Sequence, residues 1–288
     1  MFVIAGVTGR VGSAAAQALL DVGASIRVLV RSDDAAEAWR LRGADAFRVD
    51  LRDGARLTEA LRDAQGFFAL LPFDVAADDL RTHAQEVISS MAIAVQDSGV
   101  PHVVMLSSGG ADLPADTGPI AHLYALEQAL ARTDTVLSAI RPGHFQEKIS
   151  DVIGTARIEG VYPVFAESAD VPVAMVATAD VGRVVARALL SHPQSSEAID
   201  VVGPVYTERE AAGMLGELLG RPLEVITLPR AAWVPALTGA GLPLQATELM
   251  VELYDADQRG LLAPRGDRTV HGAVELGSTI ARLVGVTG

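Results

Sequence analysis

The fold is decided by residues 2–12, which read FVIAGVTGRVG. A short apolar run ends in glycines spaced G-x-x-G-x-x-G, and an Ala- and Leu-rich stretch at 13–22 follows. Glycines at this spacing allow a tight turn and a close approach of the backbone to a pyrophosphate, and the N-terminus of a following helix offers free N–H groups. The pattern predicts a strand, a turn and a helix that bind a dinucleotide. The predicted contacts are Gly6, Thr8, Gly9, Arg10, Val11 and Gly12.

Apolar runs and helical stretches alternate after this turn. The runs at 26–30, 47–49, 66–71 and 102–106 are continuous rather than alternating, which indicates strands buried on both faces. Helices are predicted at 33–42, 55–63 and 76–98. The order predicts an α/β protein with a doubly wound parallel sheet of the Rossmann type, in which ligands bind at the carboxyl ends of the strands.

The second half is less regular. We expect a sixth strand at 136–141, a helix at 179–190 with Asp180 as its N-cap, and a strand at 198–202. Thr207 and Glu210 have the spacing of a capping box, which predicts a helix over 207–219. A strand at 223–228 and helices at 230–237 and 245–259 follow, and the Gly-, Pro- and Arg-rich residues 260–272 are predicted to form a loop.

Composition excludes several classes of protein. The 288 residues include no cysteine, so disulfides, thiolate nucleophiles and cysteine-bound metals are excluded. The formal net charge of −13 argues against a nucleic-acid or anionic membrane partner. The apolar N-terminus lacks the basic start of a signal peptide, and no apolar run is long enough to span a bilayer. We expect a cytoplasmic protein, a monomer or homodimer, with a small-molecule substrate.

The second strand ends in Arg31, where enzymes that prefer NAD usually carry an acidic residue. An arginine there suits the 2′-phosphate of NADP(H), and Arg10 in the glycine turn could add a second positive charge. The alternatives are that Arg31 is a solvated surface residue and that Asp33 or Asp34 binds a ribose. The sequence favours NADP(H) over NAD(H).

Other candidates lie at the predicted ends of strands. Asp50 and Leu51 follow the third strand, where the carboxylate could accept a hydrogen bond from adenine or could cap the next helix. The cofactor candidates after the fourth and fifth strands are Leu70, Leu71, Pro72 and Ser107, and the substrate candidates are Phe73 and Ser108. Core packing for the leucines and strand capping for the serines are the alternatives.

The usual proton-transfer pair of short-chain dehydrogenases is missing. Those enzymes use Tyr-x-x-x-Lys, but Gln128 stands four residues after Tyr124, and the chain's single lysine, Lys148, lies beyond the sixth strand. Tyr124 could still donate a hydrogen bond, and His122 two residues earlier could move protons near neutral pH. His122 and Tyr124 are the catalytic candidates, each with surface or packing roles as alternatives.

The sequence resembles the NmrA-like family of atypical short-chain dehydrogenase/reductases, which includes NAD(P)H:quinone oxidoreductases. Beyond the glycine motif, Arg31 and the strand ends, the resemblance rests on IRPGHF at 140–145, ATADVG at 177–182 and LGRP at 219–222. It implies a Rossmann domain over 1–150 and a smaller C-terminal α/β substrate domain over 151–288, with 179–202 returning to the sheet. His144 and Phe145 would then line the substrate cleft. The family often has asparagine where this chain has Lys148.

The predicted function is an NAD(P)(H)-dependent oxidoreductase for a small carbonyl, quinone or aromatic polyketide-like substrate. A quinone is reduced easily without an activated tyrosine, so the missing lysine matters less there. Two alternatives remain open: a dinucleotide-sensing regulator without turnover, and a tailoring oxygenase with an NAD(P)-binding fold. The six histidines are scattered along the chain, and no metal site is expected.

Overall fold

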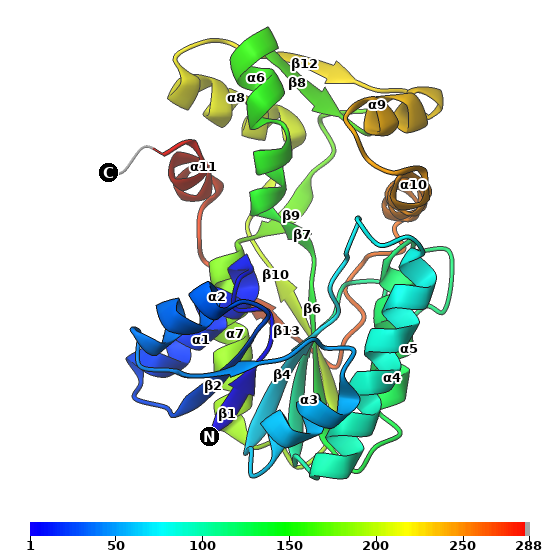
Figure 1. Ribbon diagram of the computed structural model, residues 1–288. Helices are drawn as coiled ribbons and strands as arrows, with labels where there is room; N and C mark the ends of the chain where they lie inside the picture. The colour runs from blue at the N-terminus through cyan, green and yellow to red at the C-terminus, as the bar shows by residue number, and fades with distance from the viewer. Residues whose placement is uncertain (286–288) are drawn as a thin grey trace.

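The computed structural model describes residues 1–285, and its centre is an eight-stranded sheet (Figure 1). The strand order is β13-β10-β6-β5-β4-β1-β2-β3, and every neighbouring pair is parallel. The order reverses between β1 and β4, which is where doubly wound sheets bind their ligands. The predicted fold class is confirmed. The strands of this sheet are β1 (Phe2–Ile4), β2 (Ile26–Val30), β3 (Asp45–Arg48), β4 (Gly66–Leu70), β5 (His102–Leu106), β6 (Val136–Pro142), β10 (Glu197–Val202) and β13 (Arg268–His271).

Helices cover both faces of the sheet, so each face has its own apolar core (Figure 1). Residues of α1, α2 and α7 pack on one face, where α1 and α7 lie side by side. Residues of α3, α4 and α5 pack on the other face. The bounds of these helices are α1 (Arg10–Asp21), α2 (Asp33–Arg40), α3 (Gly54–Leu61), α4 (Leu80–Ser98), α5 (Ile120–Leu130) and α7 (Thr178–Ser191).

A smaller part of the molecule lies beyond the carboxyl ends of these strands (Figure 1). It contains the sheet β11-β9-β7, the parallel pair β12-β8 and a third apolar core. Its strands are β7 (His144–Phe145), β8 (Val161–Val164), β9 (Val173–Val176), β11 (Val205–Tyr206) and β12 (Glu224–Thr227). Its helices are α6 (Ile153–Glu159), α8 (Glu208–Leu219), α9 (Trp233–Gly239), α10 (Leu244–Gln258) and α11 (Leu276–Val284), with short 3₁₀ turns η1 (Gln146–Asp151) and η2 (Arg230–Ala232).

Two local predictions are wrong. The predicted loop 260–272 contains β13, which pairs with β10 at the edge of the main sheet. Asp180 does not cap α7, because the first N–H of that helix, on Thr178, donates instead to the Glu147 carboxylate at 2.9 Å. The Asp180 carboxylate accepts from the Val274 amide at 2.9 Å, so it fixes the chain just after β13.

The N-terminal caps of two other helices agree better with the sequence than the start of α7 does. The capping box of Thr207 and Glu210 is present at the start of α8, as predicted. The helix predicted at 76–98 begins later, at Leu80, because the Asp79 side chain accepts from the Thr82 amide and caps it. Within residues 1–285, no helix combines the length and apolar character needed to cross a bilayer.

Candidate functional site

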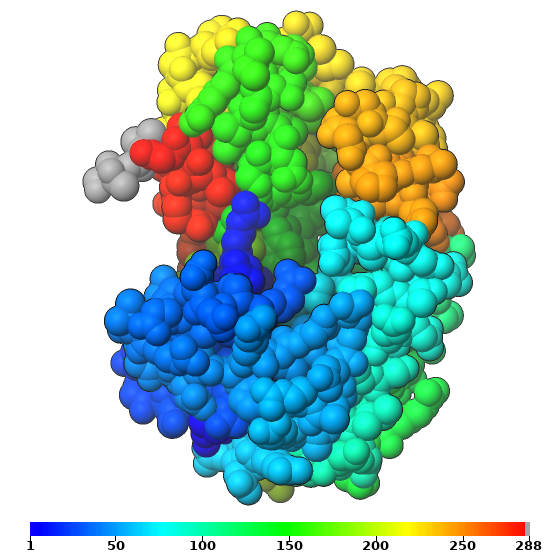
Figure 2. Space-filling view, viewed as in Figure 1, coloured from blue at the N-terminus to red at the C-terminus, as the bar shows by residue number. Residues whose placement is uncertain are grey.

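A cleft of about 490 Å³ opens between the carboxyl ends of the central strands and the smaller part of the molecule. Figure 2 shows this hollow in the middle of the face, between the blue and cyan sheet region and the green and orange region above it. Residues that follow β4, β5 and β6 line one side, and one face of α10 lines the other. The cleft therefore lies where a doubly wound sheet places its ligand.

The glycine turn follows β1 and leads into α1, whose first residue, Arg10, lines the cleft. Gly6 has φ +67°, and a Cβ there would lie 1.9 Å from the Leu70 side chain. A Cβ on Gly12 would lie 2.3 Å from the Gly6 carbonyl oxygen, so α1 can approach the turn only with glycine at this position. Thr8, Gly9 and Arg10 are exposed, whereas Val11 is buried in the core.

The N-terminus of α1 is suited to an anion. Gly9 is the N-cap, no side chain caps the helix, and its first turn has no acidic residue. The first N–H groups of a helix have no partner within it, and together with the helix dipole they attract phosphate. Arg10 lines the cleft and also donates to the Ser150 hydroxyl at 3.1 Å. The residues fit the pyrophosphate of a dinucleotide.

Arg31 lies exposed just after β2, and within residues 1–285 it has no ion-pair partner. Two acidic residues near it are engaged: Asp33 pairs with Arg48 at 3.2 Å, and Asp50 with Arg52 at 2.7 Å. The hydrogen bond from Arg52 holds the pKa of Asp50 at about 2. The alternative role of Asp50 as a helix cap is wrong.

Asp53, rather than Asp50, caps α3, because its side chain accepts from the Arg56 amide. Leu51 packs against the core on the α3 and α4 face, and Leu70 lies against Gly6. Five of the predicted strand-end residues and the two after β6 line the cleft: Leu71, Pro72, Phe73, Ser107, Ser108, His144 and Phe145. Phe73 is exposed at 41% and forms part of the mouth.

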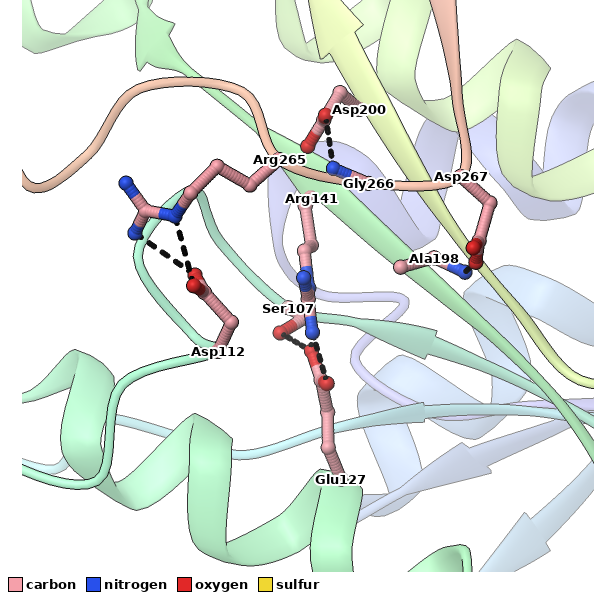
Figure 3. Close-up of polar contacts among 9 residues, drawn as sticks. All are labelled: Ser107, Asp112, Glu127, Arg141, Ala198, Asp200, Arg265, Gly266 and Asp267. Carbon is pink, nitrogen blue, oxygen red and sulfur yellow. Dashed lines mark hydrogen bonds and ion pairs between the residues drawn. The ribbon is translucent and has the colours of Figure 1, made fainter.

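A buried polar network lies behind Ser107 (Figure 3). The Ser107 hydroxyl donates to Glu127 Oε1 at 2.5 Å. Arg141, near the end of β6, donates through two nitrogens to the same carboxylate, at 3.0 and 2.6 Å. The Arg141 and Glu127 side chains are only 10% and 8% exposed. Because the hydroxyl proton of Ser107 is committed to Glu127, Ser107 offers an acceptor to the cleft.

A second set of contacts in Figure 3 holds the segment between α10 and β13 against the sheet region. Arg265 donates to both carboxylate oxygens of Asp112, at 2.7 and 2.9 Å, in the loop after β5. The Gly266 amide donates to Asp200 of β10 at 2.6 Å. These contacts fix the segment that follows α10, the helix that lines the cleft.

The two predicted catalytic residues lie on different sides of α5. His122 lines the cleft, and burial together with the Arg81 charge lowers its pKa. Tyr124 is not among the cleft residues; it lines a shallow groove between α4 and α5. The geometry therefore gives no support to a role for Tyr124 in proton transfer, since α5 turns its side chain away from the cleft.

Residues of α10 complete the opposite side of the cleft. Met250, Leu253, Tyr254 and Asp257 follow one another at helical spacing and all line it. Asp257 Oδ1 lies 3.0 Å from His144 Nε2. The Lys148 ammonium lies 4.7 Å from the centre of the Tyr254 ring, and burial raises the pKa of Tyr254 to about 12.

The sequence did not single out these α10 residues, nor Glu127, because only the fold brings them to the strand ends. Arg141 stands in the quoted IRPGHF motif but had no assigned role. Within residues 1–285, no three His, Asp or Glu side chains are grouped so as to hold a metal ion.

The profile of the NmrA-like family matches residues 1–260. The chain belongs to the NmrA-like family. An NAD(P)H azoreductase from Xenophilus azovorans is 25% identical over 257 residues, which is 88% of this chain and 86% of the relative. The family resemblance seen in the sequence is confirmed.

Solved structures show the same fold for NmrA-like proteins. Triphenylmethane reductase of Citrobacter sp. superimposes with a TM-score of 0.82 at 20% identity, over 99% of both chains. An NADPH-dependent quinone oxidoreductase from Escherichia coli, complexed with NADPH, superimposes with a TM-score of 0.76 at 21% identity, over 99% of this chain and 100% of the other.

Proposed function

We propose that this NmrA-like protein is an NADP(H)-dependent oxidoreductase that reduces small conjugated acceptors such as quinones and dyes. One observation carries the proposal: Arg10, the first residue of the uncapped helix α1, lines the same cleft that α10 and the strand ends line with apolar side chains. A dinucleotide on the turn and an aromatic acceptor against α10 would thus meet in one cavity. The names of the relatives, an azoreductase, a triphenylmethane reductase and a quinone oxidoreductase, support this choice.

The residues of the chain would divide the work as follows. The N–H groups of the α1 N-terminus bind the pyrophosphate, and Arg31 binds the 2′-phosphate. Leu71 and Pro72 hold the middle of the dinucleotide against the end of β4. The Ser107 hydroxyl, oriented by Glu127, accepts a hydrogen bond from an amide or hydroxyl group in the cleft. When bound, NADP(H) supplies a hydride.

Water exclusion comes from the apolar residues of the substrate side. Phe73 lies at the mouth, and Ile120, Leu123 and Leu253 line the interior. A planar conjugated acceptor suits such a surface, because its rings replace water there without leaving polar groups unpaired. Quinones and cationic dyes also accept a hydride without strong acid catalysis, which agrees with the absence of the Tyr-x-x-x-Lys pair.

The activity is tested by mixing purified protein with NADPH or NADH and a panel of quinones, azo dyes and cationic triphenylmethane dyes. Loss of absorbance at the reduced nicotinamide band measures turnover. We expect NADPH consumption with at least one of these acceptors. Tight NADPH binding without consumption across the whole panel would contradict the proposed reductase.

The preference for NADP(H) is tested at Arg31. Loss of the hydrogen bonds between the arginine and the 2′-phosphate removes about 1.5–3 kcal/mol of binding free energy. Arg31→Ala should therefore weaken NADPH binding at least tenfold and leave NADH binding within twofold. Fluorescence titration of the reduced nucleotides measures both affinities. Arg62→Ala, which removes another exposed arginine outside the cleft, is the control. If Arg31→Ala lowers the affinities for NADPH and NADH equally, Arg31 does not bind the 2′-phosphate.

A further inference from the structure

We propose that His144, held by Asp257, is the residue that gives a proton to the acceptor during reduction. This inference rests on the proposed function and names the acid that replaces the missing Tyr-x-x-x-Lys pair. It depends on where the two side chains lie and on which other groups the cleft offers.

The His144–Asp257 pair bridges two sides of the cleft. Asp257 Oδ1 and His144 Nε2 are 3.0 Å apart, and both residues line the cavity. The side chains are 27% and 40% exposed, so solvent can reach them to restore a proton. A carboxylate on Nε2 fixes the ring orientation and favours the tautomer with hydrogen on that nitrogen. In the described part of the chain Nδ1 has no hydrogen-bond partner, which leaves it available to a ligand.

The backbone holds His144 beside the carboxyl ends of β5 and β6, where the proposed cofactor and acceptor would meet. Residue 144 follows β6 by two positions, and β6 is the sheet neighbour of β5, whose end carries Ser107. The Gly143 amide donates to the Val201 carbonyl at 3.1 Å, and β7 pairs with β9 through His144 and Met175. A ligand that reaches from the glycine turn across the ends of β4 and β5 arrives beside this segment.

Other candidate acids in the cleft fit the role less well. His122 has no carboxylate partner in residues 1–285, and burial and Arg81 lower its pKa, so it is neutral at pH 7. Burial keeps Tyr254 protonated, with a pKa of about 12, which makes it a weak donor. Tyr124 lies outside the cleft.

The titratable and charged groups around the His144–Asp257 pair come from α1, α4, α5, η1, α10 and the loop after β4. Glu147 of η1 is tied to Arg282 and Thr178, and Lys148 lies over the Tyr254 ring. The titratable and charged groups that line the cleft besides the pair are Arg10, Asp74, His83, His122, Glu147, Lys148, Asp151 and Tyr254. Of the carboxylates that line the cleft, Asp257 is the one in contact with His144.

The proposed step balances as follows. With NADPH bound, the acceptor would take up a hydride, two electrons with one hydrogen, at one end of its conjugated system, and NADP⁺ would be left. The imidazolium of His144 gives a proton to the other end, a carbonyl or quinone oxygen or an azo nitrogen. An azo bond thus becomes a hydrazo bond, and a quinone becomes a hydroquinone. Solvent then returns a proton to His144.

Acceptors that differ in proton demand provide the test. An azo dye needs a proton on nitrogen, whereas the carbocation of a triphenylmethane dye becomes neutral on taking a hydride and needs none. His144→Gln should lower kcat/KM for the azo dye by about 10²-fold or more, and Asp257→Asn by a smaller factor. Both variants should leave the cationic dye within about threefold of wild type. His271→Gln and Asp255→Asn, which make the same changes outside the cleft, are the controls.

The pH profile provides a second readout, which an azo dye alone allows. A donor must be protonated, so wild-type kcat/KM for an azo dye should fall as pH rises into the alkaline range. His144→Gln should remove this alkaline loss, and His122→Gln should keep it. The reverse pattern would assign the proton to His122 and overturn the proposal.

A third readout needs no turnover. In the cofactor-free protein, nitrogen NMR should show His144 with hydrogen on Nε2, and Asp257→Asn should abolish that preference while NADPH affinity stays unchanged. A mixed tautomer in the wild type contradicts the pairing. No consumption of NADPH by wild type with any acceptor overturns the proposed function itself, whereas consumption that His144→Gln leaves unchanged for every acceptor overturns the donor role alone.

Discussion

The two sides of the cleft are built in opposite ways. The centre of the proposed nucleotide side is a continuous stretch, Gly6 to Gly12, in which the backbone itself would form the binding surface and a Cβ on Gly12 would lie 2.3 Å from another backbone atom. The acceptor side is made of side chains from residues as far apart as Phe73 and Leu262. The glycines of the nucleotide side therefore tolerate almost no change, whereas the acceptor side can vary residue by residue while the fold stays intact.

The largest loss of stability is expected for the buried contacts of Ser107, Glu127 and Arg141 under the cleft. Glu127→Gln removes the charge that neutralises Arg141 and leaves that guanidinium buried, which should lower the free energy of unfolding by about 3–5 kcal/mol. Urea unfolding followed by circular dichroism measures it. Glu59→Gln breaks the exposed pair with Arg56 and should cost less than about 1 kcal/mol. Equal effects of the two substitutions would show that the buried pair contributes no more than a surface one.

Gly12→Ala tests the nucleotide side directly. The new methyl group would overlap the Gly6 carbonyl, so we expect a loss of about 1–3 kcal/mol in stability and loss of NADPH binding in a fluorescence titration. Gly213→Ala makes the same change in α8, where nothing lies within 4 Å, and should stabilise the protein by about 0.5–1 kcal/mol. NADPH binding by Gly12→Ala with wild-type affinity would contradict the close-approach argument.

His102 should make the sheet region sensitive to acid. Its side chain is buried beside Ser138, and burial lowers its pKa to about 4. The unfolded chain binds the proton near pH 6.5, so this contribution to stability is complete above that pH and is lost as pH falls toward 4. We expect protonation of this residue in the unfolded chain to lower the free energy of unfolding by about 2 kcal/mol between pH 7 and pH 4.

The comparison for His102 is made with two variants in unfolding experiments at pH 7 and pH 4. His102→Gln should show a smaller loss between these pH values than wild type. His271→Gln, at an exposed position on β13, should behave like wild type. If all three proteins lose the same stability, the acid sensitivity comes from other groups.

Lys148→Met should have the smallest effect and should separate the two sides of the cleft. The ammonium over Tyr254 contributes about 0.5–1 kcal/mol as a cation–π contact, so KM for an aromatic acceptor should rise about two- to fivefold. NADPH affinity should not change. Arg42→Met, which removes a cation from above Trp39 outside the cleft, is the control. A larger effect on NADPH than on the acceptor would place Lys148 at the nucleotide.

The sequence predicted the nucleotide side because the signal is local. The strand, the glycines and the helix at 2–22 are adjacent in the chain, and the structure contains all three, although α1 begins at Arg10, three residues before the predicted start. Arg31 and Phe73 could be predicted as candidate site residues because each stands just after a predicted strand. The family and fold class are confirmed, while the assigned roles of individual residues and the domain boundary at residue 150 stay predictions.

The acceptor side could not be predicted in the same way. Asp257 reaches His144 across 113 positions of sequence, and nothing near either residue indicates the partner. The sequence does not indicate β13 for a similar reason, since glycines and a proline surround it and its partner β10 lies about 70 positions earlier in the chain, where Glu197 contacts Arg268. Tyr124 was misplaced because the turn of α5 that faces the cleft depends on how that helix packs.

The chain passes between the two parts of the molecule repeatedly, after β6, before α7, after β10, before β13 and before α11. These passages lie against one another: a Cβ on Gly203, after β10, would be 2.0 Å from the Met175 carbonyl oxygen of β9. The smaller part of the molecule is therefore not a transferable module of the gene. A chimaera that cut the chain once near residue 150 would take β10 and β13 away from the parent sheet, so recombination between relatives must exchange several separate segments to carry one specificity into another.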